Sequence, residues 1–483
     1  MRKRLLAVLA ILLVSRIMAH IPVPLADPQT LKQVLNNLFT SSGTPQLLSF
    51  LNILSGGALA NFSIMIAGLG PYINASIIMQ LLTKAIPKLE ALRKEGEYGQ
   101  RKINQYTRII TLPLALLQSV GSIYVIRTYA EKVGGIGDIT ANTSLLQWVL
   151  MITALTGGSM LLMWLGELIT ERSVGNGISL IITVGIVGGL PSTVAQLYGM
   201  IFNKTSQWHA FGHVLHVSVR GLDWVLAVLA AVVVVTWVVV KLNEAARRIT
   251  INYAKRVQGN RTYGGVTTVL PVKLISAGVV PIIFAVAFLS VPSFIGKLLE
   301  GSKNVHWQHI GTNLGTWFQT PQGGTFVQSD WHSYIYPATY FLLVFIFTFF
   351  YTSVTFNSKE IAENLQKQGG FIEGVRSGQQ TEKHLSKIVN RLTLFGAASL
   401  GMLALLPIVA QIFLPNANVA LGGTSVLILV SVSLETLRAV ESRALMVTYD
   451  QYAQPDFFHE MEEADVENAK KRRFSLLPFR RRK

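Results

Sequence analysis

The sequence contains no cysteine and few charged residues for its length. The absence of cysteine excludes disulfides, thiolate metal sites and cysteine nucleophiles. Only 14% of the 483 residues are Asp, Glu, Lys or Arg, whereas a soluble globular chain carries about 25%. Apolar residues make up 50% of the chain and occur in long runs between charged loops. The pattern excludes an ordinary soluble enzyme and indicates a polytopic membrane protein.

Ten apolar segments approach the length of about 20 residues that a helix needs to cross the hydrocarbon core. They are residues 5–24, 71–86, 108–129, 146–169, 178–200, 222–243, 272–298, 333–356, 389–414 and 420–445. Helices are expected because lipid offers no partner for unpaired backbone groups. The basic start of the first segment is typical of a signal peptide, but no A-x-A cleavage site follows, so we interpret it as a retained span.

The distribution of basic residues predicts the orientation of these spans. With the N-terminus inside, the inner loops and ends contain 34 Lys and Arg and the outer loops contain 7. This is a strong positive-inside signal, so both termini are expected in the cytosol. Topology therefore accounts for most of the net charge of +17, without a polyanionic ligand.

Residues 55–86 are too interrupted for a single helix. A short amphipathic piece at 58–67 is followed by Gly68, Leu69, Gly70 and Pro71, and then by a second apolar run. Glycine frees the backbone and proline removes a donor, so a half-helix, a break and a helix are expected. A re-entrant element beside a conduit and a proline-kinked structural helix are both compatible with this pattern.

Two long inner loops are expected to project into the cytosol. Residues 248–253 and 261–269 are rich in β-branched and aromatic side chains and flank a Gln-Gly-Asn turn, which predicts a hairpin. The loop at 357–391 is glycine-containing and mixed in charge, and it suggests a second projection. The tail after residue 446 changes from acidic to basic and is expected to be mobile, with cations that suit anionic lipid or RNA.

Signatures of catalysis are incomplete. The sequence has no H-E-x-x-H, G-x-S-x-G or P-loop motif. A Gly-x-Gly-Asp segment ending at Asp138 and a Tyr-Asp pair ending at Asp450 suggest an intramembrane aspartyl protease, but both fall outside the spans. His209, His213 and His216 have helical spacing, yet no carboxylate accompanies them, so incidental histidines are the favoured interpretation.

Short segments spread along nearly the whole chain resemble one family. They are residues 16–24 (RIMAHIPVP), 54–59 (LSGGAL), 71–82 (PYINASIIMQLL), 94–97 (KEGE), 101–108 (RKINQYTR), 163–172 (MWLGELITER), 175–179 (GNGIS), 252–256 (NYAKR), 391–394 (RLTL) and 422–425 (GGTS). Each is weak alone, but together and in order they resemble the SecY family, the channel subunits of the bacterial protein translocase.

The resemblance implies an all-α membrane fold with ten transmembrane helices in two pseudosymmetric five-helix halves, arranged as a clamshell. The N-terminal half would span 1–200, with a re-entrant plug half-helix at about 55–67. An outer loop at 201–221 would lead to the C-terminal half at 222–445, with cytosolic loops at about 244–271 and 357–391, before the tail at 446–483.

The resemblance also assigns residues to a pore and its lateral gate. An apolar pore ring, able to gate by dewetting, aligns with Leu69, Ile73, Ile182, Ile283 and Ile428. The plug aligns with Ala58, Leu59, Asn61, Phe62, Ile64 and Met65. The gate would lie between spans 71–86 and 108–129 on one side and 272–298 and 333–356 on the other. Gln80 matches a polar gate position, but its usual Asn partner is Ile275 here, with Ser276 adjacent and out of phase.

The implied function is a passive protein-conducting channel that is not an enzyme and needs no cofactor. It would pass unfolded preproteins across the bacterial cytoplasmic membrane and release signal and transmembrane helices sideways into lipid. Implied partners are SecE- and SecG-like small membrane subunits, the SecA motor and the ribosome. Anionic lipid is a further candidate ligand on the charge of the tail alone. Docking of SecA or the ribosome is assigned to Lys255, Arg256, Arg261 and Arg376, although a second arginine usual beside Arg261 is Asn260.

A secondary transporter with broken helices is the main alternative. It would carry a small solute and an ion, and such proteins usually place ionisable groups near the membrane midplane. Few charges lie within the expected spans, the clearest being Arg16, Glu167 and Glu435. This scarcity argues against coupling by protonation, but leaves open a sodium site made of carbonyl groups.

Overall fold

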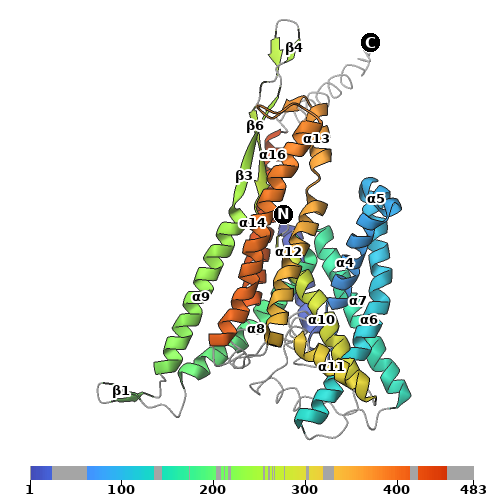
Figure 1. The fold of residues 1–483 in the computed structure, drawn as a ribbon, viewed down its shortest axis with the longest axis vertical. Coiled ribbons are helices and arrows are strands. Elements are labelled where there is room, and N and C mark those ends of the chain that lie inside the picture. Colours follow the sequence, from blue (N-terminus) through green and yellow to red (C-terminus); the bar gives the residue numbers. More distant parts are fainter. Residues whose placement is uncertain are drawn as a thin grey trace, which may run out of the picture.

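The molecule is an elongated helical bundle with a small β-sheet projecting from one end (Figure 1). The computed structural model describes residues 2–23, 63–134, 144–172, 175–202, 208–210, 213–215, 219–253, 256–258, 261–263, 265, 267–276, 278–300, 304–318, 331–413 and 422–453. The helices are α1 (Arg2–Met18), α4 (Gly70–Ala85), α5 (Pro87–Lys94), α6 (Glu97–Gly134), α7 (Leu145–Glu171), α8 (Gly177–Ile201), α9 (Val219–Glu244), α10 (Val280–Glu300), α11 (Val305–Trp317), α12 (Ile335–Thr355), α13 (Ser358–Lys367), α14 (Gln379–Phe413) and α16 (Gly422–Ala453), with a 3-10 turn η1 (Trp331–Tyr334).

A helix lies over each of the ten expected spans, and five helices meet a criterion of length and apolarity for crossing a membrane within the described residues. These five are Leu145–Glu171, Gly221–Glu244, Val280–Glu300, Trp331–Lys367 and Gln379–Leu406. Large apolar side chains on the outside of the bundle, such as Leu117, Val233 and Met402, are 68%, 68% and 69% exposed. Exposed apolar surface of this extent suits lipid rather than water, while the full count of ten spans stays a prediction.

Local sequence determines where several helices begin. Ser144 and Gln147 form a reciprocal capping box at the start of α7, and the Asn176 side chain accepts from the backbone of Ile178 and Ser179 at the start of α8. Such side chains satisfy amide groups that have no partner in the first helical turn. Pro71 occupies the first turn of α4, where its missing N–H costs nothing.

The expected hairpin is present and is longer than the sequence suggested. The strands β3 (Ala246–Tyr253) and β6 (Thr267–Lys273) pair antiparallel from Ala246 opposite Lys273 to Asn252 opposite Thr267. Beyond them, β4 (Arg256–Gln258) and β5 (Arg261–Tyr263) pair at the tip. Outside this region, β1 (Trp208–Ala210) pairs with β2 (His213–Leu215).

The second projection joins the first. The two-residue strand β7 (Gly370–Phe371) pairs with the end of β3, which gives a three-stranded sheet in the order β6-β3-β7. Ile249 and Val272 of this sheet pack with Ile372, Leu385 and Ile388 in one buried cluster. The two projecting loops predicted from sequence therefore form one folded unit. It lies at the end of the bundle where α9, α13 and α14 come together (Figure 1).

Three of the expected span boundaries differ clearly from the structure. The segment expected at 272–298 becomes helical only at Val280, because residues up to Lys273 belong to β6 and Gly278 turns the chain with a φ of 60°. The segment expected at 5–24 ends as a helix at Met18, and Pro22 pairs with Ser63 as an isolated bridge. Proline lacks the N–H that would continue the helix. In addition, α16 continues to Ala453, past the expected end at 445.

Candidate functional site

Five aliphatic side chains from four helices belong to the central buried core of the bundle. Leu69 and Ile73 come from the start of α4, Ile182 from α8, Ile283 from α10 and Ile428 from α16. We call these five residues the aliphatic ring. All five belong to one buried cluster, and their exposed fractions lie between 0% for Leu69 and 9% for Ile428. The same cluster includes aromatic residues of α10 and α12, among them Phe284 and Phe347, so the ring residues lie within a large apolar core.

The segment before α4 is held directly beside the ring. Residues 64–69 form consecutive turns, with hydrogen bonds from Ile66 N to Ser63 O (3.1 Å) and from Gly68 N to Met65 O (2.9 Å). Gly68 has a φ of 58°, which favours glycine and breaks the chain before α4 as expected. The Met65 side chain is 1% exposed and belongs to the same cluster as the ring.

Three helices of the N-terminal half fix this segment. Ser63 Oγ donates to the carbonyl oxygen of Met18 at the end of α1 (2.9 Å). Ser159 Oγ of α7 donates to the Gly68 carbonyl oxygen (2.8 Å), and Gln118 Nε2 of α6 donates to the Ala67 carbonyl oxygen (3.3 Å). Buried carbonyl groups outside regular structure need such partners. The segment is therefore positioned by polar contacts that the sequence pattern did not reveal.

Only part of the predicted plug can be located. Ile64 and Met65 lie in the turns described above, so residues 64–67 are not the helix that the sequence suggested. Glycine and the approach to Pro71 explain the irregular backbone, since neither continues a helix. Ala58, Leu59, Asn61 and Phe62 lie outside the described residues.

The predicted polar gate residues each bond within their own side of the bundle. Gln80 Nε2 donates to Ser76 Oγ one turn earlier in α4 (3.1 Å). Ser276 Oγ donates to Thr352 Oγ1 of α12 (3.3 Å). Ile275, at the usual Asn position, is 5% exposed and packs in the central cluster. The structure therefore does not join Gln80 and Ser276 by a hydrogen bond across the expected gate.

Other contacts bridge the same helices at their two ends. At one end, Lys84 Nζ donates to the Ser353 carbonyl oxygen (3.2 Å), and Arg93 Nη2 donates to the Val354 carbonyl oxygen (3.1 Å). Both acceptors lie in the last turn of α12, where carbonyl groups have no helical partner and attract cations. At the other end, the Phe294 ring of α10 lies so close to Gly121 of α6 that a Cβ there would sit 1.7 Å from its Cζ.

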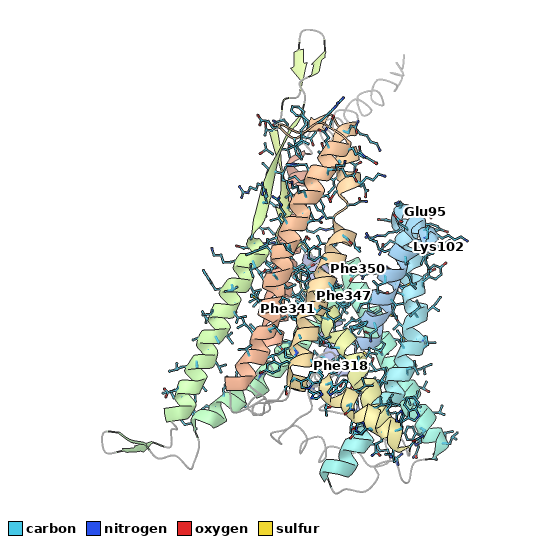
Figure 2. The ribbon with its side chains drawn as sticks, viewed as in Figure 1. Glu95, Lys102, Phe318, Phe341, Phe347 and Phe350 are labelled. Carbon is cyan, nitrogen blue, oxygen red and sulfur yellow. The ribbon has the colours of Figure 1, made fainter. Side chains whose placement is uncertain are left out.

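Aromatic contacts complete one side of this interface. The Phe284 ring of α10 lies edge-on to Phe347 and Tyr351 of α12, with ring centroids 6.0 Å and 6.3 Å apart. Edge-to-face pairs of this kind add to the hydrophobic packing. Figure 2 shows Phe347 and Phe350 of α12 about midway along the bundle. Glu95 and Lys102 lie at the end of the bundle where α5 meets α6.

Two of the charged residues within the expected spans, Glu167 and Arg16, contact a neighbouring helix. Glu167 of α7 forms an ion pair with Arg108 of α6, in which Arg108 Nε donates to Oε1 at 3.1 Å. The Arg16 guanidinium of α1 occupies the space that a side chain at Gly188 of α8 would need. Outside the spans, the hydrogen bond from Lys94 and its charge lower the pKa of the Glu90 carboxyl. The Arg108–Glu167 pair joins α6 and α7, and the described residues contain no cluster of metal-ligating side chains.

The predicted docking residues lie on the projecting sheet and its connection to α14. Arg376 is exposed between β7 and α14, and its carbonyl oxygen accepts from Thr381 Oγ1 (2.9 Å). Arg256 begins β4 and Arg261 begins β5, on either side of the tip. Lys255 lies outside the described residues. His209 and His213 fall in β1 and β2 rather than on one helix, and His216 is not among the described residues.

Taken with the exposed apolar surface, this core defines a polytopic helical membrane protein with a buried apolar centre. The family model of SecY matches residues 63–437. The protein translocase subunit SecY of Streptomyces galbus is 38% identical over 455 residues, covering 93% of this chain and 96% of that relative. The chain therefore belongs to the SecY family.

Two solved structures share the fold. One concerns how the plug domain of the SecY protein stabilises the closed state of the translocation channel and maintains a membrane seal. It superposes with a TM-score of 0.56 at 19% identity, covering 89% of this chain and 90% of that one. The other is Sec61 in the canine ribosome-channel complex from the endoplasmic reticulum, with a TM-score of 0.52 at 19% identity, covering 89% of this chain and 91% of that one.

Proposed function

We propose that polypeptides cross the membrane through the aliphatic ring of this chain, which is the protein-conducting channel of a translocon. The observation that supports the ring most directly is the convergence of Leu69, Ile73, Ile182, Ile283 and Ile428 in one buried cluster. A narrow apolar constriction excludes water and ions when nothing fills it. When an extended polypeptide passes through the ring, the same side chains can pack around it and keep ions out. Aliphatic groups can do this because they need no hydrogen-bond partners.

The gate between α4 and α6 on one side and α10 and α12 on the other is the proposed exit for hydrophobic segments. Hydrogen bonds from Lys84 and Arg93 and the packing of Phe294 on Gly121 hold it closed at both ends. Once the gate opens, a signal helix can leave the ring for lipid, since each buried CH₂ contributes about 0.8 kcal/mol. Opening is then a shift between two packed arrangements.

The chain itself performs no hydrolysis in this proposal. The work comes from a SecA motor and ATP, or from elongation on a ribosome docked on the projecting sheet through Lys255, Arg256, Arg261 and Arg376. SecE- and SecG-like subunits complete the channel, and unfolded preproteins are its substrates. The excess of basic residues in the inner loops supports a cytosolic position for the sheet and both termini in this proposal.

Site-specific crosslinking tests the ring. A photocrosslinker replaces Ile283, and a signal-bearing secretory chain is arrested in transit; Met402 of α14, 69% exposed, serves as the lipid-facing control. We expect crosslinks at Ile283 that need a functional signal, and none at Met402. A chain that engages the protein elsewhere without reaching Ile283 overturns the ring. If no chain engages at all, a solute transporter becomes the better interpretation.

A further inference from the structure

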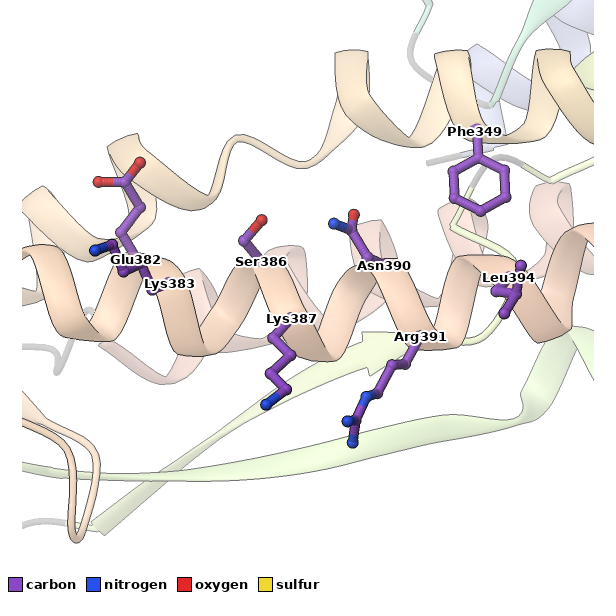
Figure 3. A pocket seen from close by; sticks show the side chains of 8 residues that line it. All are labelled: Phe349, Glu382, Lys383, Ser386, Lys387, Asn390, Arg391 and Leu394. Carbon is purple, nitrogen blue, oxygen red and sulfur yellow. The ribbon is translucent and has the colours of Figure 1, made fainter.

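A groove lies on the exposed side of α14 next to the end of α12. Its volume is about 610 Å³, and its lining includes three cations, Lys383, Lys387 and Arg391, and two apolar side chains, Phe349 and Leu394. Figure 3 shows the cations on successive turns of α14, and Phe349 extending from α12 toward Leu394. The groove therefore offers a line of positive charge that ends in an apolar patch.

The three cations lack acidic partners in the part of the chain that the structure describes. Each is exposed, and none of them takes part in an ion pair there. Their four-residue spacing places them on one side of the helix, where like charges destabilise it. Glu382 is the acidic residue of the lining and lies beside Lys383, at the end away from Leu394. The groove therefore has a net positive charge that an acidic occupant would compensate.

The last described helix runs to the same end of the bundle as this groove (Figure 1). Arg438 Nη1 of α16 donates to the Asn243 carbonyl oxygen (3.3 Å) at the end of α9, shortly before β3 begins. The helix then continues from Arg438 to Ala453, which adds about 22 Å of rise. Leu385 of α14 lies in one buried cluster with Ile249 of β3. The last turns of α16 and the first turns of α14 therefore both run alongside the sheet.

The sequence that follows α16 is strongly acidic. Residues 454–483 lie outside the described residues. Within 456–467 every Asp, Glu, Lys or Arg is a carboxylate: Asp456, Glu460, Glu462, Glu463, Asp465 and Glu467. Three of them, Asp456, Glu460 and Glu463, have the four- and three-residue spacing that also aligns the cations of the groove. The same segment contains Phe457, Phe458 and Met461, so it combines negative charge with apolar side chains.

The length of the chain lets this segment reach the groove. An extended chain covers about 3.3 Å per residue, so residues 454–467 can reach about 45 Å from Ala453. A helix is only about 10–12 Å wide, and α16 contacts α14 directly. A segment joined by a short tether has an effective concentration in the millimolar range. An acidic segment of the same chain therefore has an advantage over any anion that must be recruited from solution.

We propose that residues 456–467 dock in this groove and cover its cations. The carboxylates of the segment pair with Lys383, Lys387 and Arg391, and its apolar side chains pack on Phe349 and Leu394. Such pairs are charge-assisted hydrogen bonds, which are stronger than those between neutral groups. The docked segment masks positive charge at the sheet end, so an anionic cytosolic partner must displace it. This last consequence rests on the proposed docking of a ribosome, whereas the contact itself does not.

Disulfide mapping tests the contact without background, because the chain contains no cysteine. Ala464→Cys is combined with Asn390→Cys in the groove, or with Thr250→Cys at an exposed position of β3 as the control. The full chain is purified with its membrane subunits, placed in phosphatidylcholine nanodiscs, oxidised briefly and digested, and the linked peptides are counted by mass spectrometry. We expect the Asn390 pair to form at least about fivefold faster than the Thr250 pair at low salt. The preference should vanish at about 1 M salt, where the screening length falls to about 3 Å.

An exchange of charges separates docking from a damaged helix. Lys383→Glu with Lys387→Glu should lower the Asn390 disulfide to the level of the Thr250 control. Adding Glu460→Lys and Glu463→Lys to that variant should restore it, which a misfolded α14 could not do. Lys359→Glu with Lys367→Glu reverses two exposed charges on α13 and should leave the disulfide unchanged.

Several results would overturn the proposal. Equal rates at Asn390 and Thr250, a preference that persists at high salt, or disulfides between two copies of the chain would each do so. Loss of the preference in nanodiscs that contain phosphatidylglycerol would assign the groove to lipid instead. Binding to non-translating ribosomes is measured separately: Glu460→Gln with Glu462→Gln and Glu463→Gln should raise the affinity several-fold. An unchanged affinity, with the disulfide preference intact, would reject the masking of a ribosome site and not the docked segment.

Discussion

The Arg93 guanidinium donates a hydrogen bond of 3.1 Å to the carbonyl oxygen of Val354, and so connects α5 to the last turn of α12 across the proposed gate. Lys84 makes the equivalent contact with Ser353 (3.2 Å). Both cations lie where the helix dipole of α12 is negative, and each contact is worth about 0.3–1 kcal/mol at an exposed helix end. Together they hold α4 and α5 against the end of α12.

Removing both cations should therefore make the gate easier to open. We expect Lys84→Gln with Arg93→Gln to raise export of a reporter with a defective signal sequence by several-fold, because a shift of about 1.4 kcal/mol changes an equilibrium tenfold. Lys88→Gln, which removes an exposed cation of α5, should leave export unchanged. Equal export by the double variant and the parent would show that these hydrogen bonds do not restrain the gate.

The contact between Gly121 and Phe294 predicts that no side chain larger than hydrogen fits at position 121, at the other end of the proposed gate. Gly121→Ala places a methyl group where the ring now lies, and overpacking of this kind costs about 1–3 kcal/mol. Phe294→Ala removes the obstacle, so the double variant should be more stable than the sum of the two single changes predicts. Thermal unfolding in nanodiscs measures this coupling.

Gly157→Ala in α7 serves as the control for that cycle, since nothing lies within 4 Å of the added methyl group. It should change the unfolding temperature little. Strictly additive effects of Gly121→Ala and Phe294→Ala would mean that Phe294 moves aside freely and does not hold α6 and α10 together.

The aliphatic ring should act as the barrier to ions. We expect Ile73→Ser with Ile283→Ser to leave the closed channel conductive, because hydroxyl groups allow water to enter a constriction that hydrocarbon keeps dry. Ile78→Ser with Val291→Ser changes the same two helices at positions that are 39% and 42% exposed, and should stay closed. Single-channel currents in planar bilayers distinguish the two variants, and a silent Ile73/Ile283 variant would argue against the ring.

Arg376 should matter for transport and not for assembly. It is exposed on the connection between β7 and α14, so Arg376→Glu reverses a surface charge without disturbing a buried contact. We expect SecA-driven transport into membrane vesicles to fall strongly while the amount of assembled complex stays constant. Lys367→Glu makes the same reversal at the end of α13 and should transport normally. Normal transport by the Arg376 variant would reject its docking role.

Long-range packing accounts for most of what the sequence could not predict. The hairpin at β3 and β6 followed from β-branched and aromatic residues on either side of a Gln-Gly-Asn turn, but β7 has two residues and no periodicity to detect. The contacts of Lys84 and Arg93 use backbone carbonyl acceptors, which leave no mark in the side-chain pattern. Apolar periodicity likewise could not separate Ile283 from other buried aliphatics, and only the family resemblance selected it.

The shared sheet has a mechanical consequence. Because β7 pairs with β3, the hairpin of β3 and β6 and the segment leading into α14 form one unit, in which Ile249, Ile372 and Leu385 pack together. A load applied to either projection exerts a torque on α9 and α14 at the same moment, since neither strand can swing alone. A motor and a ribosome that bind different points of this unit would therefore apply force to the same two helices.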